Sequence, residues 1–255
     1  MTRMASLTPA ERLLWSLGIG AACEIDLEAV AWTRGITVRS RPLKGCEARI
    51  FGDGSRAIVS VNSASSAERR RFSLAHEIGH WEMHRGKVLF CRSDDIGGDR
   101  GASAIERMAN QYAAELLMPS YILNPIAERK PLTFAIIDQV AQEFRVSRTA
   151  AAIRLVDKAD KPAMLVCYSQ TKREWFHKSP SWPAELWLRG ELDTRSRAFD
   201  AQFGRKAESR VMLKVPADAW FDRAVAGLYE IRESVVSGGS GTTLSLIEID
   251  RIHRR

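Results

Sequence analysis

The spacing of hydrophobic and polar positions predicts helices near the start of the chain. Thr8-Pro9 followed by Glu11 is typical of a helix start, because threonine caps free amide groups and proline fits the first helical turn. Asp26 is placed to cap a second helix. Gly35 is placed to end it in the left-handed conformation, which glycine adopts without strain.

Residues 36–61 show strand patterns instead. Hydrophobic runs at 36–38, 48–51 and 56–61 have the length and composition of short strands. Gly52-Asp53-Gly54 joins the last two runs, and these residues tolerate the positive φ angles of a hairpin turn. We expect a small antiparallel sheet here.

Two longer helices are predicted after the sheet. Ser65-Ser66-Ala67-Glu68 resembles a capping box and opens a helix that is expected to run to about His84. A segment rich in serine, aspartate and glycine, residues 92–102, separates it from a helix over residues 103–118. Pro119 ends that second helix.

In the second half of the chain, strand patterns replace helix patterns at about residue 160. Residues 130–158 predict a pair of short helices, whereas 164–168, 211–215 and 244–249 have strand patterns. The glycine-rich residues 237–241 are expected to form a flexible hairpin loop. They carry no phosphate-site signal, because no helix start follows them.

Composition excludes several classes of protein. The chain has 255 residues, of which 45% are apolar and 27% charged, as in globular proteins. No run approaches the ~18 apolar residues of a membrane span, and the first residues do not resemble a secretory signal. The four cysteines are scattered singly, which argues against a disulfide framework and a cysteine zinc site. We therefore expect a cytoplasmic protein with no membrane partner.

The net charge is modestly positive. There are 38 Lys and Arg residues against 31 Asp and Glu, a formal charge of +7. Such a balance permits contact with nucleic acid without requiring it.

The motif that carries chemistry is His76-Glu77-Ile78-Gly79-His80. Two histidines four residues apart lie on one face of a helix, where their imidazoles can bind one Zn²⁺. Glu77 is then placed to accept a proton from a zinc-bound water and to pass it to the leaving amine. The alternative is three histidines on an ordinary helix, either exposed to solvent or hydrogen-bonded in the core, since so short a motif also arises by chance.

Glu106 is the expected third metal ligand. It shares a helix face with Ala109 and Ala113, small residues that let this helix approach the motif. The rivals are His84, one turn beyond the second histidine, and three loop aspartates, Asp94, Asp95 and Asp99. One straight helix does not readily aim three side chains at one ion, so His84 is expected nearer the helix end or around the ligands.

Residues 35–119 resemble the metallopeptidase domain of the ImmA/IrrE family. The stretches that carry the resemblance are RRFSLAHEIGH at residues 70–80 and ERMANQYAAELLMP at residues 106–119. The resemblance implies a zincin-like domain in which His76, His80 and Glu106 bind zinc, with manganese as a second candidate, and Glu77 is the catalytic base. It also implies that the substrate is an Xre-type helix-turn-helix repressor, cleaved to derepress stress-response or mobile-element genes.

Residues 139–155 have the pattern of a helix-turn-helix. In a DNA-binding protein, Arg148, Thr149 and Arg154 would lie near the major groove. The alternative is a helical hairpin that packs the peptidase domain against the rest of the chain.

The last segment offers no sharp motif. Its tryptophans either line a ligand pocket or fill a core, and the core is the more common role for large aromatic residues; they are Trp175, Trp182, Trp187 and Trp220. His177 and His253 have no sequence neighbours that suggest a metal role.

These observations predict an α+β protein in three parts. A zincin-like metallopeptidase domain with a small antiparallel sheet covers residues 1–125, and a helix-turn-helix-like connector covers 126–160. The layout resembles longer IrrE-type proteins, which implies that residues 161–255 form a GAF-like sensory α+β domain. The predicted function is zinc-dependent cleavage of a repressor, with His84 and Tyr112 as candidates for a group around the metal ligands.

Two other functions remain open at this level. The protein could be a DNA-binding transcriptional regulator that uses Arg148 and Arg154 and has an inactive peptidase-like domain. It could also act by forming a complex with a repressor without cleaving it.

Overall fold

The computed structural model describes residues 6–84, 104–128, 130–170, 172–204, 208–239 and 241–252. The chain divides into two compact units. The first comprises residues 1–128 and 140–147, and the second comprises 129–139 and 148–255. The expected connector, 126–160, thus contributes residues to both units, and the three-part division stays a prediction.

The first unit begins with the two predicted helices. Helix α1 (Pro9–Ser16) has a capping box in which the Thr8 N–H donates to Glu11 Oε2 at 3.1 Å. A short 3₁₀ helix, η2 (Ala22–Glu24), precedes α2 (Leu27–Thr33), which Asp26 caps by accepting from the N–H groups of Glu28 and Ala29. Gly35 has φ of 78°, the left-handed conformation expected after the helix.

The sheet that follows is mixed, so the prediction of an antiparallel sheet was wrong for its first strand. Strands β2 (Ala48–Gly52) and β3 (Ala57–Asn62) form the predicted antiparallel hairpin. Strand β1 (Ile36–Arg41) lies on the other side of β3 and runs parallel to it, in the order β1-β3-β2. Residues 42–47 are long enough to carry the chain past β3 to the far edge, a choice that the strand pattern alone does not encode.

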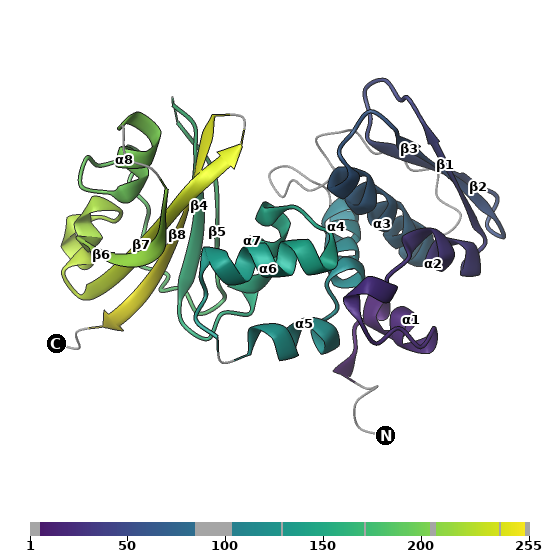
Figure 1. Ribbon diagram of the computed structural model, residues 1–255, viewed down its shortest axis with the longest axis horizontal. Coiled ribbons are helices and arrows are strands. Elements are labelled where there is room, and N and C mark those ends of the chain that lie inside the picture. Colours follow the sequence, from purple (N-terminus) through teal and green to yellow (C-terminus); the bar gives the residue numbers. More distant parts are fainter. Residues whose placement is uncertain are drawn as a thin grey trace. The chain divides into compact units, whose positions relative to one another are not determined.

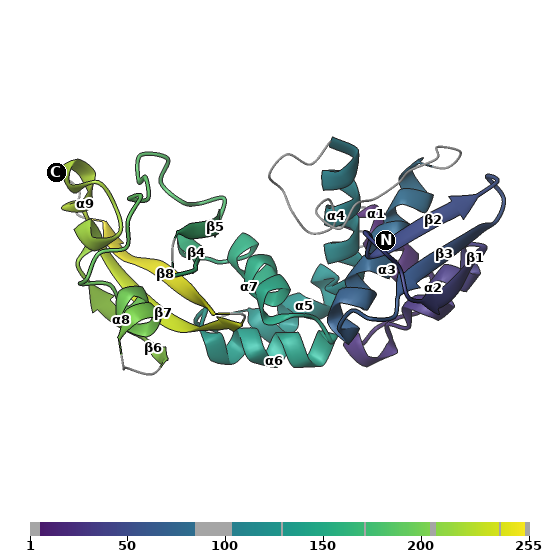
Figure 2. The ribbon, with the colours of Figure 1, turned by 90° about the horizontal axis from the view of Figure 1, so that it is seen from above.

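Three helices complete the part of this unit that holds the motif. Helix α3 (Ala67–His84) packs against β2 and β3, and α4 (Ala104–Leu117) packs against α3 (Figures 1 and 2). Helix α5 (Ser120–Ala127) begins at the proline expected to end α4, and its Ser120 N–H donates to the buried carboxylate of Glu11 at 2.6 Å. The predicted start of α3 and the predicted end of α4 are confirmed within a residue or two.

Two further helices form the predicted helical pair. Helix α6 (Phe134–Phe144) ends at Arg145, which adopts a left-handed φ of 54°, and α7 (Arg148–Asp157) begins three residues later. Within the second unit, α7 packs against two strands of its sheet. None of the helices in the described ranges combines the length and the apolar character that crossing a membrane requires.

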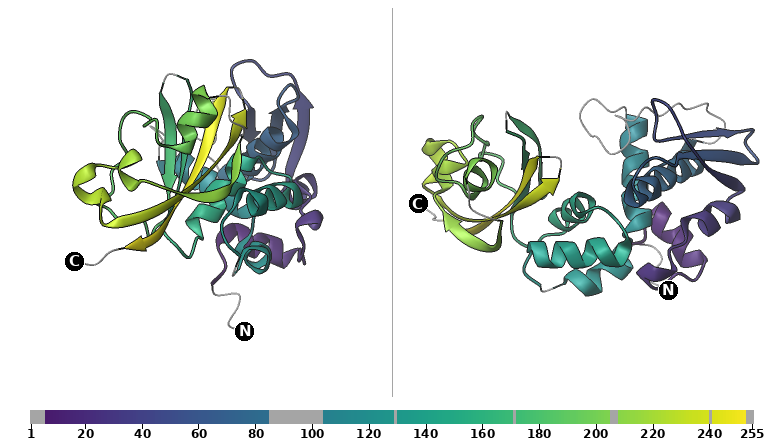
Figure 3. Two further views of the ribbon diagram at one scale, coloured as in Figure 1. Left: turned by 60° about the vertical axis from the view of Figure 1, so that its left-hand side comes forward. Right: turned by 45° about the horizontal axis from the view of Figure 1, so that its top comes forward.

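The second unit is built on a five-stranded antiparallel sheet in the order β5-β4-β8-β7-β6 (Figure 3). Its strands are β4 (Ala163–Tyr168), β5 (Arg173–Lys178), β6 (Ser209–Val215), β7 (Tyr229–Gly239) and β8 (Thr242–Ile252). The three predicted strands are present. The predicted loop at 237–241 is shorter than expected, because its first three residues continue β7 and Gly239 pairs with Thr242.

The core on one face of this sheet is aromatic. Trp182 and Trp220 are 5% and 2% exposed and belong to the same buried cluster, whereas Trp187 is 72% exposed. Helix α8 (Arg197–Phe203), the 3₁₀ helix η3 (Ala217–Ala219) and the short helix α9 (Arg223–Ala226) contribute to or flank this cluster. Two of the four tryptophans therefore fill the core, as the more common role predicted.

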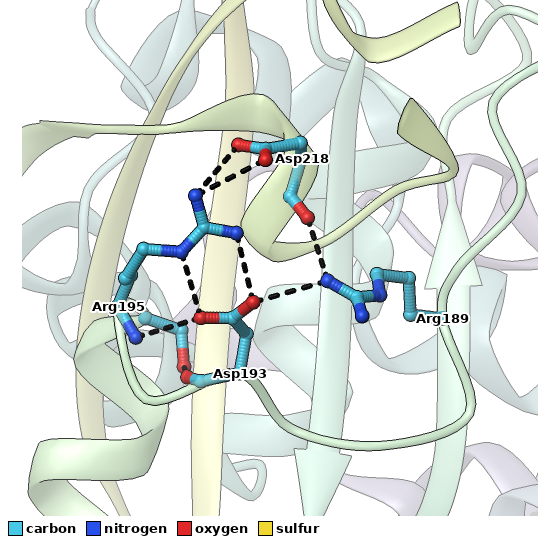
Figure 4. Close-up of polar contacts among 5 residues, drawn as sticks. Arg189, Asp193, Arg195 and Asp218 are labelled. Carbon is cyan, nitrogen blue, oxygen red and sulfur yellow. Dashed lines mark hydrogen bonds and ion pairs between the residues drawn. The ribbon is translucent and has the colours of Figure 1, made fainter. Parts of the chain in front are cut away.

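An ion-pair network holds the long connection before α8 against η3 (Figure 4). Arg195 donates to both Asp193 and Asp218, and Arg189 donates to Asp193 at 3.0 Å and to the Asp218 carbonyl at 2.9 Å. The Arg195 guanidinium keeps the pKa of Asp193 well below its usual range. Networks of this kind order surface loops more effectively than isolated pairs do.

Candidate metal centre

Three predicted ligands from two helices meet at one point in the first unit. His76 and His80 project from α3, and their Nε2 atoms lie 3.0 Å apart. Glu106 projects from the first turn of α4, and its Oε2 lies 3.2 Å from Nε2 of His76 and 3.4 Å from Nε2 of His80. No other such metal-binding group occurs among the residues that the structure describes.

These separations fit a tetrahedral ion. Zinc bonds to nitrogen and oxygen of ~2.0–2.1 Å place any two ligands of a tetrahedron about 3.3 Å apart. The three observed distances, 3.0, 3.2 and 3.4 Å, scatter around that value. Three protein ligands also leave the fourth position open, as in catalytic rather than structural zinc sites.

Asn110 fixes the orientation of the first histidine. Nδ1 of His76 lies 2.9 Å from Oδ1 of Asn110, an oxygen that only accepts hydrogen bonds, so the Nδ1–H donates and Nε2 keeps its lone pair for a metal. Partners of this kind hold a ligating imidazole in the correct tautomer. Asn110 was not predicted from the sequence, although its four-residue offset from Glu106 puts both residues on one face of α4.

Water is largely excluded from the residues of the motif. His76 and Glu77 are 0% exposed and His80 is 1% exposed, while the side chain of Glu106 is 12% exposed. Burial strengthens electrostatic interactions at such a site, since little solvent screens them.

Close contact between α3 and α4 depends on a small residue. A Cβ atom on Gly79 would lie 3.1 Å from Cβ of Tyr112 and 3.3 Å from the carbonyl oxygen of Ala109. Glycine at this position therefore lets α4 bring its glutamate to the two histidines. This explains why the residue within the motif is glycine.

A second set of contacts fixes α3 from its other side. Arg34, which follows α2, donates from Nε and Nη2 to the carboxylate of Glu82 at 2.8 and 3.0 Å. The indole N–H of Trp81 donates to the Arg34 carbonyl at 2.9 Å. These contacts hold the helix in place without involving the metal-facing side chains.

No described contact joins the remaining candidates to the three candidate ligands. Tyr112 is 3% exposed and packs beside Gly79, and burial raises the pKa of its hydroxyl, with Glu82 adding to the effect. The side chain of His84 and the loop aspartates, Asp94, Asp95 and Asp99, lie outside the described residues. Their predicted roles stay predictions.

The arginine expected to read DNA is held by an acidic residue. Arg148 Nε lies 2.6 Å from Asp138 Oδ1, and its Nη1 donates to the Ser237 carbonyl at 3.1 Å. Arg210 also pairs with Asp138, at 2.7 Å. These contacts favour a structural role for Arg148, while a DNA-binding role for Arg154 is untested.

The histidine that the sequence left without a partner has one. His177 Nε2 lies 2.6 Å from Asp157 Oδ1, which joins β5 to the end of α7. His253 lies outside the described residues. The His177 contact pairs two side chains only, and no metal-binding group includes it among the described residues.

Comparison with known families agrees with the geometry. Residues 32–156 match the family model of the IrrE N-terminal-like domain, Peptidase_M78. The chain belongs to the ImmA/IrrE family. The matched segment contains the three ligand residues, Asn110 and Glu77.

Two curated relatives match the chain over part of its length. The chain is 29% identical over 188 residues to the radiation response metalloprotease IrrE of Deinococcus radiodurans, covering 71% of this chain and 55% of that protein. It is 30% identical over 123 residues to the protein of the same name from Deinococcus deserti, covering 48% of this chain and 44% of that protein. The chain thus spans about half the length of these relatives.

A solved structure shares the fold over most of the chain. A Mycobacterium tuberculosis transcriptional regulator aligns with a TM-score of 0.63 at 15% identity, covering 94% of this chain and 75% of that one. At this identity the likeness concerns the fold alone. The GAF-like assignment of the second unit stays a prediction.

Proposed function

We propose that the protein is a zinc-dependent endopeptidase that cleaves a helix-turn-helix repressor. The observation that carries the proposal is the meeting of His76, His80 and Glu106 at tetrahedral spacing beside a fully buried Glu77. The relatives named as metalloproteases support the reaction class. The repressor as substrate rests on the family resemblance, and it would place the reaction in the cytoplasm.

Each residue of the site has a separate role in peptide hydrolysis. A zinc ion held by the three ligands would polarise the scissile carbonyl and lower the pKa of a bound water toward ~7. Glu77 accepts the proton of the attacking water and delivers it to the nitrogen of the leaving peptide. Asn110 keeps the His76 ring in the tautomer that leaves Nε2 available.

Two substitutions separate metal binding from catalysis. We expect Glu77→Gln to retain zinc and to lose cleavage by about 10²-fold or more, because the amide cannot accept the proton. We expect His76→Ala to lose zinc as well. The measurements are zinc content by elemental analysis and cleavage of the repressor encoded nearest to this gene, with Zn²⁺, with Mn²⁺ and with a chelator.

Glu68→Gln is the matched control, because Glu68 lies exposed in the first turn of the same helix. It is expected to leave both measurements unchanged. Cleavage by Glu77→Gln at the wild-type rate would contradict the proposed mechanism. Tight complex formation between the wild-type protein and the intact repressor, without cleavage under any metal condition, would favour a non-enzymatic role.

No second function is proposed for DNA contact. Arg148, one of the two arginines of that hypothesis, pairs with Asp138, and this contact does not favour DNA binding. Binding of duplex DNA that weakens steeply with salt, in the absence of any proteolysis, is the result that would restore it.

We further propose that the second unit regulates the peptidase as a GAF-like sensory domain. Its antiparallel sheet with helices and an aromatic core supports this role without identifying a ligand. Binding of a small molecule to the second unit with a change in cleavage rate is the result that this proposal expects.

A further inference from the structure

Ser73 is a buried hydroxyl on α3 that the proposed mechanism does not use. The residue is 0% exposed, and its Oγ makes no hydrogen bond with any residue that the structure describes. A serine inside a helix commonly donates to the carbonyl four residues earlier, but this one does not. Buried polar atoms almost always have partners, so a hydroxyl left in this state calls for an explanation.

The position of Ser73 on the helix places it beside the motif. It lies four residues before Glu77 and seven before His80, spacings that fall on one face of an α-helix. Helical side chains lean toward the N-terminus and cover the turn before their own. A side chain at position 77 that follows this rule lies over position 73.

Two other pairs of side chains four residues apart on α3 approach each other. The rings of His80 and His76, four residues apart, have centroids 4.6 Å apart. The rings of His76 and Phe72, again four residues apart, have centroids 6.5 Å apart. Glu77 and Ser73 stand in the same relation along the same helix.

We propose that Ser73 is a positioning residue for Glu77. When a ligand occupies the metal centre, the Ser73 hydroxyl donates a hydrogen bond to one carboxylate oxygen of Glu77 and directs the other oxygen toward the bound ligand. A neutral donor suits this task, because it orients the carboxylate and leaves it able to accept a proton. The inference rests on the proposed function, in which Glu77 is the base.

The test uses a ligand that probes the base without a peptide substrate. Acetohydroxamate chelates zinc through two oxygens and has a proton that a neighbouring carboxylate accepts. Its affinity for the zinc-loaded full chain is measured by calorimetry for wild type, Ser73→Ala, Ser73→Thr, Glu77→Gln and the double variant Ser73→Ala/Glu77→Gln. Zinc affinity is measured for each protein first.

We expect Ser73→Ala to weaken acetohydroxamate binding about tenfold, the loss typical of one hydrogen bond to a charged group, with zinc affinity unchanged. Ser73→Thr retains the hydroxyl and is expected to bind within about twofold of wild type. In the Glu77→Gln background, Ser73→Ala should add little, because the two residues act as one unit. A purely structural role of Ser73 would give the same loss in both backgrounds.

Three outcomes overturn the inference. They are a wild-type affinity for acetohydroxamate in Ser73→Ala, equal losses of affinity in the alanine and threonine variants, and additive losses of affinity in the double variant.

If the alanine variant does not fold, Ser73→Cys, whose thiol is a weaker donor, replaces it in the same set of measurements. If the wild-type protein binds no zinc, the proposed function itself fails; if zinc and acetohydroxamate bind without coupling to Ser73, only the role of Ser73 fails.

Discussion

At the scale of single residues, the candidate metal site depends on side chains outside the group formed by His76, His80 and Glu106. Asn110 accepts the His76 Nδ1–H and so determines which ring nitrogen faces Glu106 and His80. The HExxH spacing identifies the ligands but does not say what orients them. That information requires α4 to be placed beside α3.

We expect Asn110→Ala to reduce zinc affinity by about 10- to 100-fold, the usual effect of removing a partner that orients a ligating histidine. The affinity is measured by competition with a chromogenic chelator. Gln111→Ala is the matched control, because this neighbouring amide contacts Glu115 rather than the ligands. Equal zinc affinities in the two variants would show that Asn110 does not orient His76.

At the scale of elements, the separation of two helices decides whether the ligands meet. Gly79 lies where α3 and α4 approach closely, with no room for a methyl group unless Tyr112 or the Ala109 backbone shifts.

In the second unit, a strand residue stabilises the start of a helix by hydrogen bonding. Glu233 on β7 accepts from the N–H groups of Arg197 and Ala198 at the start of α8, at 2.9 and 2.7 Å.

We expect Gly79→Ala to lower the free energy of unfolding by about 1–3 kcal/mol, as overpacking in a core usually does. Zinc affinity should fall as well, because α4 carries Glu106. Urea unfolding and zinc competition measure the two effects. Gly190→Ala is the control, since a Cβ there meets no atom within 4 Å. A Gly79→Ala protein with unchanged stability and zinc affinity would argue against the tight approach.

Glu233 predicts a pH dependence of stability. Burial raises its pKa, against the opposing effect of the Trp220 indole N–H and the two backbone donors. Folding then favours the protonated carboxyl, so this contribution is present below the usual glutamate pKa and is lost as the pH rises through the raised value. We expect the free energy of unfolding to decrease over that interval.

Glu233→Gln is expected to remove that part of the pH dependence, because the amide does not titrate. Urea unfolding at a series of pH values measures it. The control is Glu230→Gln on the same strand, where Glu230 pairs at the surface with Lys214 at 2.9 Å. If the glutamine variant at position 233 keeps the full wild-type slope, another group is responsible.

At the scale of the whole molecule, the two compact units do not follow the order of the sequence. Residues 140–147 belong to the first unit, although residues 129–139 before them belong to the second. Arg145 shows how this segment is attached, because its Nη2 donates to the Ile25 carbonyl at 2.9 Å. A division of the chain at a single point would therefore cut one unit or the other.

We expect a fragment of residues 1–147 to be more stable than a fragment of residues 1–128. The shorter fragment lacks the part of α6 and the turn after it that complete the first unit. Its melting temperature should be lower by about 5 °C or more, which corresponds to roughly 1 kcal/mol in a domain of this size. Calorimetry with saturating zinc is the measurement, and equal melting temperatures would mean that residues 140–147 contribute little.

The sequence by itself determined the local features. Caps at Thr8 and Asp26, the left-handed Gly35 and the hairpin at residues 52–54 depend on neighbouring residues only, and each was correctly predicted. The histidine spacing likewise follows from helix geometry alone.

Only the tertiary structure decided what depends on distant residues. The parallel pairing of β1 with β3, the contact of His177 with Asp157 and the approach of Asn110 to His76 join residues 20 to 34 positions apart. Strands β5 and β7 were not predicted either. Hydrophobic pattern records which residues are buried but not which neighbour buries them. The buried hydroxyl of Ser73 became a candidate for the same reason, since a sequence does not show whether a polar atom has found its partner.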